Sequence, residues 1–174
     1  ITREYGLAPE KVVVFSAGNE DLLWRRSRCA AEKSVVRVDS SFFLFVGSLL
    51  PRRQVGLVVE ALARLPVSYH FVLVGESNPT KYETLMSVAR QWNVADRVHC
   101  PGHVSDEELD DLYGRATALV SPSTYEGFGL PVLEAMNRGL PVLAWDIPVM
   151  REVAADAAVL LHSGDVAGFA AAML

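Results

Sequence analysis

The sequence predicts an α/β fold built on a Rossmann-like, doubly wound parallel sheet. From Phe42 onward, short apolar runs alternate with amphipathic stretches, which is the pattern of successive βαβ units. Most of these apolar runs pass directly into a loop that contains glycine, proline or serine. The 174 residues, 51% apolar and 21% charged, are sufficient for one compact core, so we expect a single main domain.

Six apolar runs are the expected strands. They cover residues 42–46, 71–74, 98–100, 118–121, 142–145 and 158–161. In a doubly wound sheet the carboxyl ends of all strands lie at one edge, and ligands bind there. We therefore expect a site among the loops that begin at Gly47, Gly75, Pro101 and Ser121.

Three helices are expected between these strands. The first has apolar residues at helical spacing, at Val55, Val58, Val59, Leu62 and Leu65. The second begins with Ser105 and Glu108, which have the spacing of a capping box. The third covers residues 130–138, with Pro131 in its first turn and Gly139 ending it.

The first forty residues follow a different pattern. Residues 2–7 are predicted to be the end of a helix and residues 12–15 a strand, with no clear periodicity afterwards. We interpret residues 1–24 as the remnant of a preceding domain with the start of a connector. Residues 25–40 are the rest of the connector, and residues 41–174 form the main domain. Because the chain begins without methionine and stops within a helical pattern, we expect a fragment of a longer protein.

Charge and cysteine usage exclude several classes of function. The net charge of -5 and pI near 5.4 leave no broad basic surface for neutralising phosphate backbones, so we expect no nucleic-acid partner. Cys29 and Cys100 lie far apart, which fits structural thiols in a reducing compartment. No apolar run reaches the roughly 18 residues of a membrane span, and the polar start is no signal peptide. We therefore expect a cytoplasmic protein.

The most informative segment, residues 121–136, joins the fourth strand to the third helix and reads SPSTYEGFGLPVLEAM. Gly127 and Gly129 allow the backbone to approach a ligand, and the helix start offers unpaired N–H groups and a positive dipole end. These features suit a diphosphate. Glu126 in the loop and Glu134 in the helix can flank it and accept hydrogen bonds from the hydroxyls of a nucleotide sugar.

On local chemistry alone, a second interpretation of this segment stays open. Two glutamates eight residues apart are weak evidence, because both could be solvated charges on a loop and a helix. The glycines could simply form a tight turn between strand and helix.

The full segment resembles the E-x7-E motif of the group 1 glycosyltransferases, retaining enzymes with the GT-B fold. The resemblance implies that Glu126 contacts hydroxyls of the donor sugar and that Glu134 holds the nucleotide ribose. It further implies that the intervening backbone meets the sugar and phosphate, at Gly127, Phe128, Gly129 and Leu130.

A second match, FLFVGSLLPRRQ at residues 43–54, resembles the first strand and basic loop of the same family's C-terminal domain. There a glycine lets the backbone approach the phosphates and a cation pairs with them. By resemblance these roles fall to Gly47 and Arg53, which makes Arg53 a catalytic candidate together with Glu126. Ser48 stands where many members have arginine, and Arg52 can compensate. Cations are also unfavourable at a helix start, which favours a ligand role for both arginines.

Shorter matches are FVLVG at residues 71–75, RVHCPGHVSDEELDDLY at 97–113 and GLPVLA at 139–144. By resemblance, Gly75 and His99 border the nucleotide base, largely through backbone groups. His99, Cys100 and His103 match no standard zinc spacing, so ordinary polar packing is expected instead of a metal site.

Taken together, the resemblance covers residues 41–174 as the donor-binding, C-terminal half of a GT-B glycosyltransferase. It implies transfer of a sugar from a nucleotide diphosphate sugar to an acceptor hydroxyl with retained anomeric configuration. No cofactor and no essential metal are expected. The acceptor, and any peripheral contact with a membrane, are expected at the missing N-terminal domain, so the fragment alone should be inactive in transfer.

Two other functions stay open. One is a nucleotide-sugar epimerase or phosphorylase of the same fold, although an epimerase needs acid and base residues around the sugar. The other is a non-catalytic module that binds a nucleotide sugar, which activity measurements would distinguish. A dinucleotide-binding dehydrogenase is a poor match, because valine replaces the third glycine of G-x-G-x-x-G at Val132. The motifs of P-loop nucleotidases and of G-x-S-x-G hydrolases are absent from the sequence.

Overall fold

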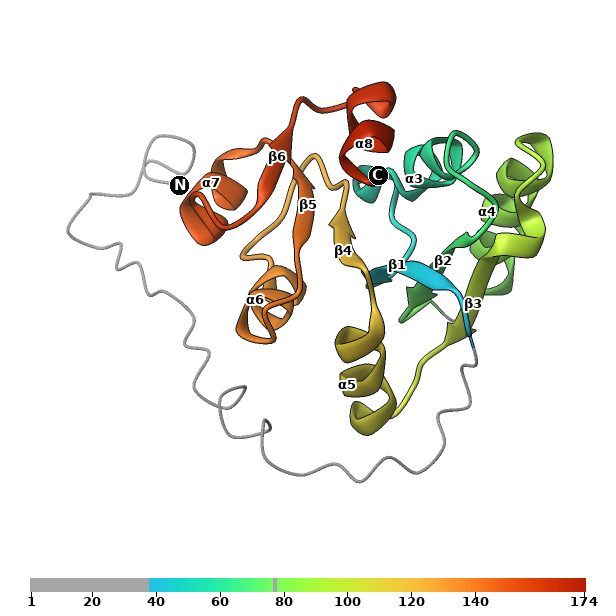
Figure 1. Ribbon diagram of the computed structural model, residues 1–174, viewed down its shortest axis with the longest axis horizontal. Coiled ribbons are helices and arrows are strands. Elements are labelled where there is room, and N and C mark those ends of the chain that lie inside the picture. The colour runs from blue at the N-terminus through green and yellow to red at the C-terminus, as the bar shows by residue number, and fades with distance from the viewer. Residues whose placement is uncertain (1–37, 77) are drawn as a thin grey trace, which may run out of the picture.

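The computed structural model describes residues 38–76 and 78–174. They contain a six-stranded sheet in the order β3-β2-β1-β4-β5-β6, in which all neighbouring strands are parallel (Figure 1). The predicted doubly wound α/β fold is therefore confirmed. The helix and strand expected before residue 16, Cys29 and most of the connector lie outside the described residues.

The strands lie close to their predicted positions. They are β1 (Ser41–Val46), β2 (Tyr69–Val74), β3 (Val98–Gly102), β4 (Ala118–Ser121), β5 (Val142–Trp145) and β6 (Val159–Leu161). Residues in the middle of β1, β2, β4 and β5 are buried on both sides of the sheet. Because helices cover both faces, the strands are almost continuously apolar and do not alternate with polar residues.

The helices form one layer on each face of the sheet (Figure 1). They are α3 (Val55–Leu62), α4 (Pro79–Gln91), α5 (Asp106–Arg115), α6 (Leu130–Asn137), α7 (Pro148–Ala154) and α8 (Val166–Ala172), with short 3-10 helices η3 (Pro51–Arg53) and η4 (Ala95–Arg97). Helix α3 packs against α4 and α8, whereas α6 packs against α7, β4 and β5.

The direction of winding reverses between β1 and β4. The chain first moves outward from β1 to β2 and β3, and then returns through α5 to β4 on the other side of β1. Because parallel crossovers are right-handed, this reversal places α5, α6 and α7 on the opposite face from α3 and α4, whereas α8 returns to pack against α3. The two loops that leave β1 and β4 therefore diverge to different faces and leave a crevice between their starts. Such a topological switch point is the usual ligand site of an open α/β sheet.

Local signals predicted the helix ends well. Ser105 accepts a hydrogen bond from the Glu108 N–H at 3.2 Å, and the Glu108 carboxylate accepts from the Ser105 N–H at 3.2 Å, so the capping box is confirmed. Pro131 lies in the first turn of α6, and Gly139 has a left-handed φ of 69° just after its end. Sequence patterns gave no bounds for α4, which begins just after the capping residue Asn78.

One expectation about the arginines was wrong. Arg52 and Arg53 do not occupy the first turn of α3 but form the separate turn η3. Gln54, with a left-handed φ of 43°, divides η3 from α3, and its Oε1 accepts a hydrogen bond from Trp145 Nε1 at 2.9 Å. The dipole of α3 therefore provides no argument for a ligand role of these cations, and such a role has to rest on their contacts.

Candidate functional site

The loops after β1 and β4 are joined at the switch point. The Thr124 N–H donates to the Arg52 carbonyl at 2.8 Å, and the Thr124 hydroxyl donates to the same oxygen at 3.1 Å. In return, Arg52 Nη1 donates to the Tyr125 carbonyl at 2.6 Å. These bonds cross more than 70 residues of sequence and place the basic loop directly beside the Glu126 loop.

Glu126 lies at the centre of this contact, with only 14% of its side chain exposed. Its Oε1 accepts a hydrogen bond from Ser123 Oγ at 2.7 Å. The same oxygen lies 3.4 Å from Arg52 Nη1 and 3.6 Å from Arg53 Nε. The structure therefore brings the predicted glutamate and both predicted arginines together. The role of the buried Ser123 was not predicted.

Arg53 packs against the backbone of Gly47. A Cβ atom on Gly47 would lie 1.5 Å from Arg53 Nη1, and Gly47 has a φ of 142°. The guanidinium also donates to the Val46 carbonyl at 3.4 Å and lies 5.8 Å from the centre of the Phe45 ring. Its Nε is buried and has no hydrogen-bond partner among the described residues. Gly47 is thus needed to admit the arginine, whose buried Nε is held only by the ion pair with Glu126 among the described residues.

Gly75 brings the next loop to the same edge. A Cβ atom on Gly75 would lie 3.3 Å from the Gly47 backbone, and the Gly75 N–H donates to the Gly102 carbonyl at 2.8 Å. Gly47 and Gly75 therefore lie together, as the sequence predicted for strand ends. The adjacent Ser48 is partly exposed, and its carbonyl accepts from the Leu50 N–H at 3.0 Å.

Glu76 fixes the relative position of these two loops and was missed by sequence reasoning. Its carboxylate accepts from the Asn78 N–H and from the Leu49 N–H, each at 2.7 Å, and lies 3.5 Å from Lys81 Nζ. These backbone hydrogen bonds, first that of Asn78 and then that of Leu49, lower the pKa of Glu76, and Lys81 lowers it further. Glu76 is therefore ionised near neutral pH.

The start of α6 faces the Glu126 cluster. Gly129 caps the helix with a left-handed φ of 83°, and a Cβ atom there would lie 3.0 Å from Met150 Cε. Four backbone N–H groups just before Pro131 donate no hydrogen bond to another described residue. They belong to Gly127, Phe128, Gly129 and Leu130. Free amides at the positive end of a helix dipole favour a bound anion.

Glu134 lies on the next turn of α6 and faces α5. Its Oε2 accepts a hydrogen bond from the Tyr113 hydroxyl at 2.8 Å. Burial, and next the charge of Glu134, raise the pKa of Tyr113 far above its ordinary value, so this hydroxyl stays protonated and donates. Glu126 and Glu134 are thus held by different kinds of partner within one segment.

These residues lie within a family match. A family model described as glycosyl transferases group 1 matches residues 29–174. The chain belongs to the group 1 glycosyltransferases. An O-antigen chain mannosyltransferase B of Escherichia coli is 32% identical over 137 residues, covering 76% of this chain and 36% of the relative. O-antigen chain mannosyltransferase RfbU of Salmonella typhimurium is 30% identical over 168 residues, covering 95% of this chain and 44% of that protein.

Solved structures support the same assignment. A sucrose-phosphate synthase from Thermosynechococcus elongatus superposes with a TM-score of 0.71 and 27% identity, covering 91% of this chain and 39% of that one. The chain therefore spans less than half the length of each of these three proteins.

Not every predicted residue of this glycosyltransferase joins the cluster. His99 lies 2.8 Å from His70, Nε2 to Nδ1, and the two rings stack near the start of β2. Burial, and next the charge of His70, lower the pKa of His99. The imidazole thus lies apart from the loops at the carboxyl edge. Cys100 is partly buried, and burial raises its pKa to about 11, which keeps the thiol protonated.

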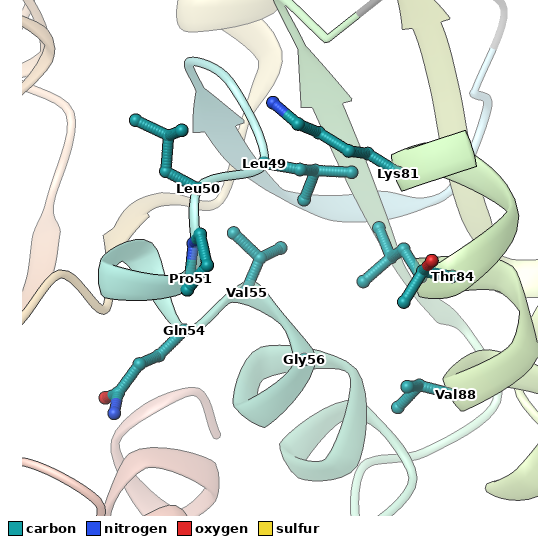
Figure 2. Close-up of a pocket in the computed structure, with 10 residues that line it drawn as sticks. Leu49, Leu50, Pro51, Gln54, Val55, Gly56, Lys81, Thr84 and Val88 are labelled. Atoms are coloured by element: carbon teal, nitrogen blue, oxygen red, sulfur yellow. The ribbon is translucent and has the colours of Figure 1, made fainter. Parts of the chain in front are cut away.

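An apolar groove with a volume of about 360 Å³ lies beside the basic loop. Figure 2 shows it between the Leu49–Leu50 loop, the start of α3 and the side of α4 that carries Lys81, Thr84 and Val88. The Glu126 cluster itself has only a small hollow, since the arginine side chains fill the space beside the carboxylate. Volume and charge therefore point to different places, because the groove is mainly apolar and the converging charges lie at the Glu126 cluster.

Two kinds of feature are absent from the described residues. No group of three or more histidine, cysteine, aspartate or glutamate side chains in residues 38–76 and 78–174 could hold a metal ion. Within the same ranges, no helix is long and apolar enough to cross a membrane.

Proposed function

We propose that this chain binds the nucleotide diphosphate sugar of a retaining glycosyltransferase, in the crevice between the β1 and β4 loops. The observation that carries the proposal is the contact of Glu126 with Arg52 and Arg53 at 3.4 and 3.6 Å, next to the start of α6. The family membership of the chain is consistent with this function.

The charges of this cluster suit a diphosphate. Two guanidinium groups and one carboxylate carry a net charge of about +1, and the free amides of residues 127–130 add donors. A diphosphate that pairs with Arg52 and Arg53 competes with Glu126 for them. The displaced carboxylate is then available to accept a hydrogen bond from a hydroxyl of the donor sugar. In this proposal, Glu134 accepts a hydrogen bond from the ribose.

The reaction follows from these positions. Departure of the sugar leaves charge on the diphosphate, and Arg53, the free amides and the α6 dipole stabilise that charge in the transition state. The sugar develops oxocarbenium character next to the Glu126 carboxylate. We propose that neither a metal nor another cofactor takes part, so EDTA should leave donor binding unchanged.

We propose that another part of the whole protein binds the acceptor. The chain covers 36% and 44% of its two mannosyltransferase relatives, which leaves room for an N-terminal acceptor-binding domain. Any peripheral contact with a membrane is assigned to that part as well. Transfer needs the acceptor to be held opposite the anomeric carbon and water to be excluded. We therefore expect the 174-residue chain to bind donors without transferring sugar.

Calorimetry on the purified chain tests this proposal. GDP-mannose and UDP-glucose are titrated first, followed by GDP, UDP, GMP and UMP. We expect saturable binding of one nucleotide series, with the diphosphate binding more tightly than the monophosphate. The names of the two relatives favour the mannose donor. If the folded chain binds no diphosphate, or binds monophosphates equally well, the proposal fails.

A further inference from the structure

We propose that Tyr113 is a positioning residue, which sets the orientation of the Glu134 carboxylate toward the nucleotide. This inference rests on the proposed function, in which Glu134 accepts a hydrogen bond from the ribose. Tyr113 lies on α5, 21 residues before Glu134, and its side chain has no predicted contact with the ligand itself.

The hydroxyl of Tyr113 holds one of the two carboxylate oxygens. The distance from Tyr113 Oη to Glu134 Oε2 is 2.8 Å, whereas the Pro131 carbonyl lies 3.4 Å from the same hydroxyl. No other side chain of the described residues donates to this carboxylate. A glutamate on a helix surface samples several rotamers, and one hydrogen bond from a fixed donor selects among them. Oε1 is then left to accept a ligand hydroxyl.

Tyr113 can act in this way because it is itself immobile. The residue is only 2% exposed, and the Arg138 guanidinium lies over its ring at 4.8 Å. Arg138 is in turn held by Asp110, at 2.8 and 2.7 Å, and donates to the Glu134 carbonyl at 2.8 Å. The side chain and the main chain of Glu134 are therefore both anchored to α5, through a tyrosine and an arginine that contact each other.

The preference of the chain for ribose over dideoxyribose nucleotides shows whether Tyr113 positions Glu134 or has a purely structural role. The experiment measures binding of UDP and GDP, each beside its 2′,3′-dideoxy counterpart, to the purified chain and its Tyr113→Phe variant. The phenylalanine keeps the ring and the arginine contact and removes only the hydroxyl. For the nucleotide that binds, we expect about tenfold weaker binding of the ribose form. We expect little change for the dideoxy form, so the ribose preference shrinks.

Two further variants are needed to interpret the result for Tyr113→Phe. Tyr69→Phe is the matched control, because Tyr69 stacks on Phe43 at the opposite, amino end of the sheet, and it should keep the ribose preference. Glu134→Ala should abolish the preference. If Glu134→Ala retains it, the proposed ribose contact of Glu134 fails, and the function of Tyr113 fails with it.

The remaining outcomes concern Tyr113 alone. If Glu134→Ala loses the preference and Tyr113→Phe keeps it, the positioning inference is overturned while the donor site stands. Equal weakening of both nucleotide forms by Tyr113→Phe also overturns it, because that is the result of a general packing defect. Should Tyr113→Phe not fold, Asp110→Ala provides the test, because it releases Arg138 from the tyrosine ring without removing the hydroxyl. A reduced ribose preference in Asp110→Ala supports positioning, and an unchanged preference overturns it.

Discussion

Glu126 and Glu134 belong to one short segment but are held in opposite ways. Glu126 lies in the loop, where two arginines and a serine hydroxyl surround a single oxygen within 3.6 Å. Glu134 lies on α6, where its oxygen meets a buried, protonated tyrosine hydroxyl. The first carboxylate is balanced by opposite charge, whereas the second is oriented by a neutral donor.

This difference indicates which of the two carboxylates can change its partner when a ligand binds. Ion pairs exchange readily when a stronger anion arrives, so Glu126 can give up its arginines to a diphosphate. A neutral hydroxyl donor on a packed ring has no such competitor, so Glu134 should keep its orientation when a ligand binds. We therefore expect the loop site to depend on salt and the helix site to depend on geometry.

Among the replacements that test this comparison, that of Arg53 is expected to have the largest effect on ligand binding. Arg53→Ala removes a charge-assisted contact with the diphosphate, so we expect about ten- to hundredfold weaker binding of the nucleoside diphosphate. The salt dependence of binding should also flatten, which calorimetry at several ionic strengths measures. Arg64→Ala is the control, because Arg64 is exposed and pairs with Glu60 of α3, away from the basic loop. A wild-type salt response in Arg53→Ala would contradict the loop assignment.

Replacement of Glu126 separates the sugar from the nucleotide. In Glu126→Ala the arginines lose their internal partner, so affinity for the bare nucleoside diphosphate should stay unchanged or rise slightly. Affinity for the nucleotide sugar should fall about tenfold, because the hydrogen bond to a sugar hydroxyl is lost. Parallel titrations of the two ligands check this. An equal loss for both would place Glu126 outside the sugar subsite.

Ser123→Ala is a smaller change, because it keeps the Glu126 carboxylate and removes one of its hydrogen bonds. The serine hydroxyl is buried and donates to Glu126 Oε1 at 2.7 Å. Without it, we expect about threefold weaker binding of the nucleotide sugar and a loss of about 1 kcal/mol in the free energy of unfolding. Denaturant titration and calorimetry measure the two quantities. Ser87→Ala is the matched control, because Ser87 is exposed on α4, outside both loops, and its replacement should leave the Glu126 contacts intact. Unchanged sugar binding in Ser123→Ala would remove this residue from the site.

A third carboxylate, that of Glu76, extends the comparison, and its replacement is expected to have the smallest effect. Glu76 is held mainly by backbone N–H groups, which lower its pKa below the ordinary value of 4.5. Its ionised form therefore stabilises the folded state at neutral pH, and this contribution is lost as the pH falls through the lowered pKa. Glu76→Gln should be less stable than wild type near pH 7, and the difference should narrow below about pH 4.5.

Thermal melts across this pH range measure the effect of Glu76. The control is Glu83→Gln, at an exposed position on helix α4, which follows the Glu76 loop. If the stability difference between Glu76→Gln and wild type is the same at both ends of the pH range, the carboxylate has no role in joining the loops.

The elements that were predicted correctly are those set by local patterns. β4 and β5 begin and end as expected, because continuous apolar runs identify strands that are buried on both faces. The capping box at Ser105 and the glycine after α6 are likewise local hydrogen-bonding and backbone requirements. Helix α4 was not delimited, because its sequence is mostly polar and has only two buried residues.

The sequence by itself determined the alternation of strands and helices. It placed Glu126, Arg53 and the flanking glycines at loops that meet one edge, and Glu134 in the helix that follows the Glu126 loop. Only the tertiary structure decided which of these groups touch. The pairing of Arg52 with Tyr125, of Leu49 with Glu76 and of Tyr113 with Glu134 joins residues 73, 27 and 21 positions apart. Such contacts depend on the strand order, in which β4 returns beside β1, and on the packing of α5 against α6, and no local pattern encodes either.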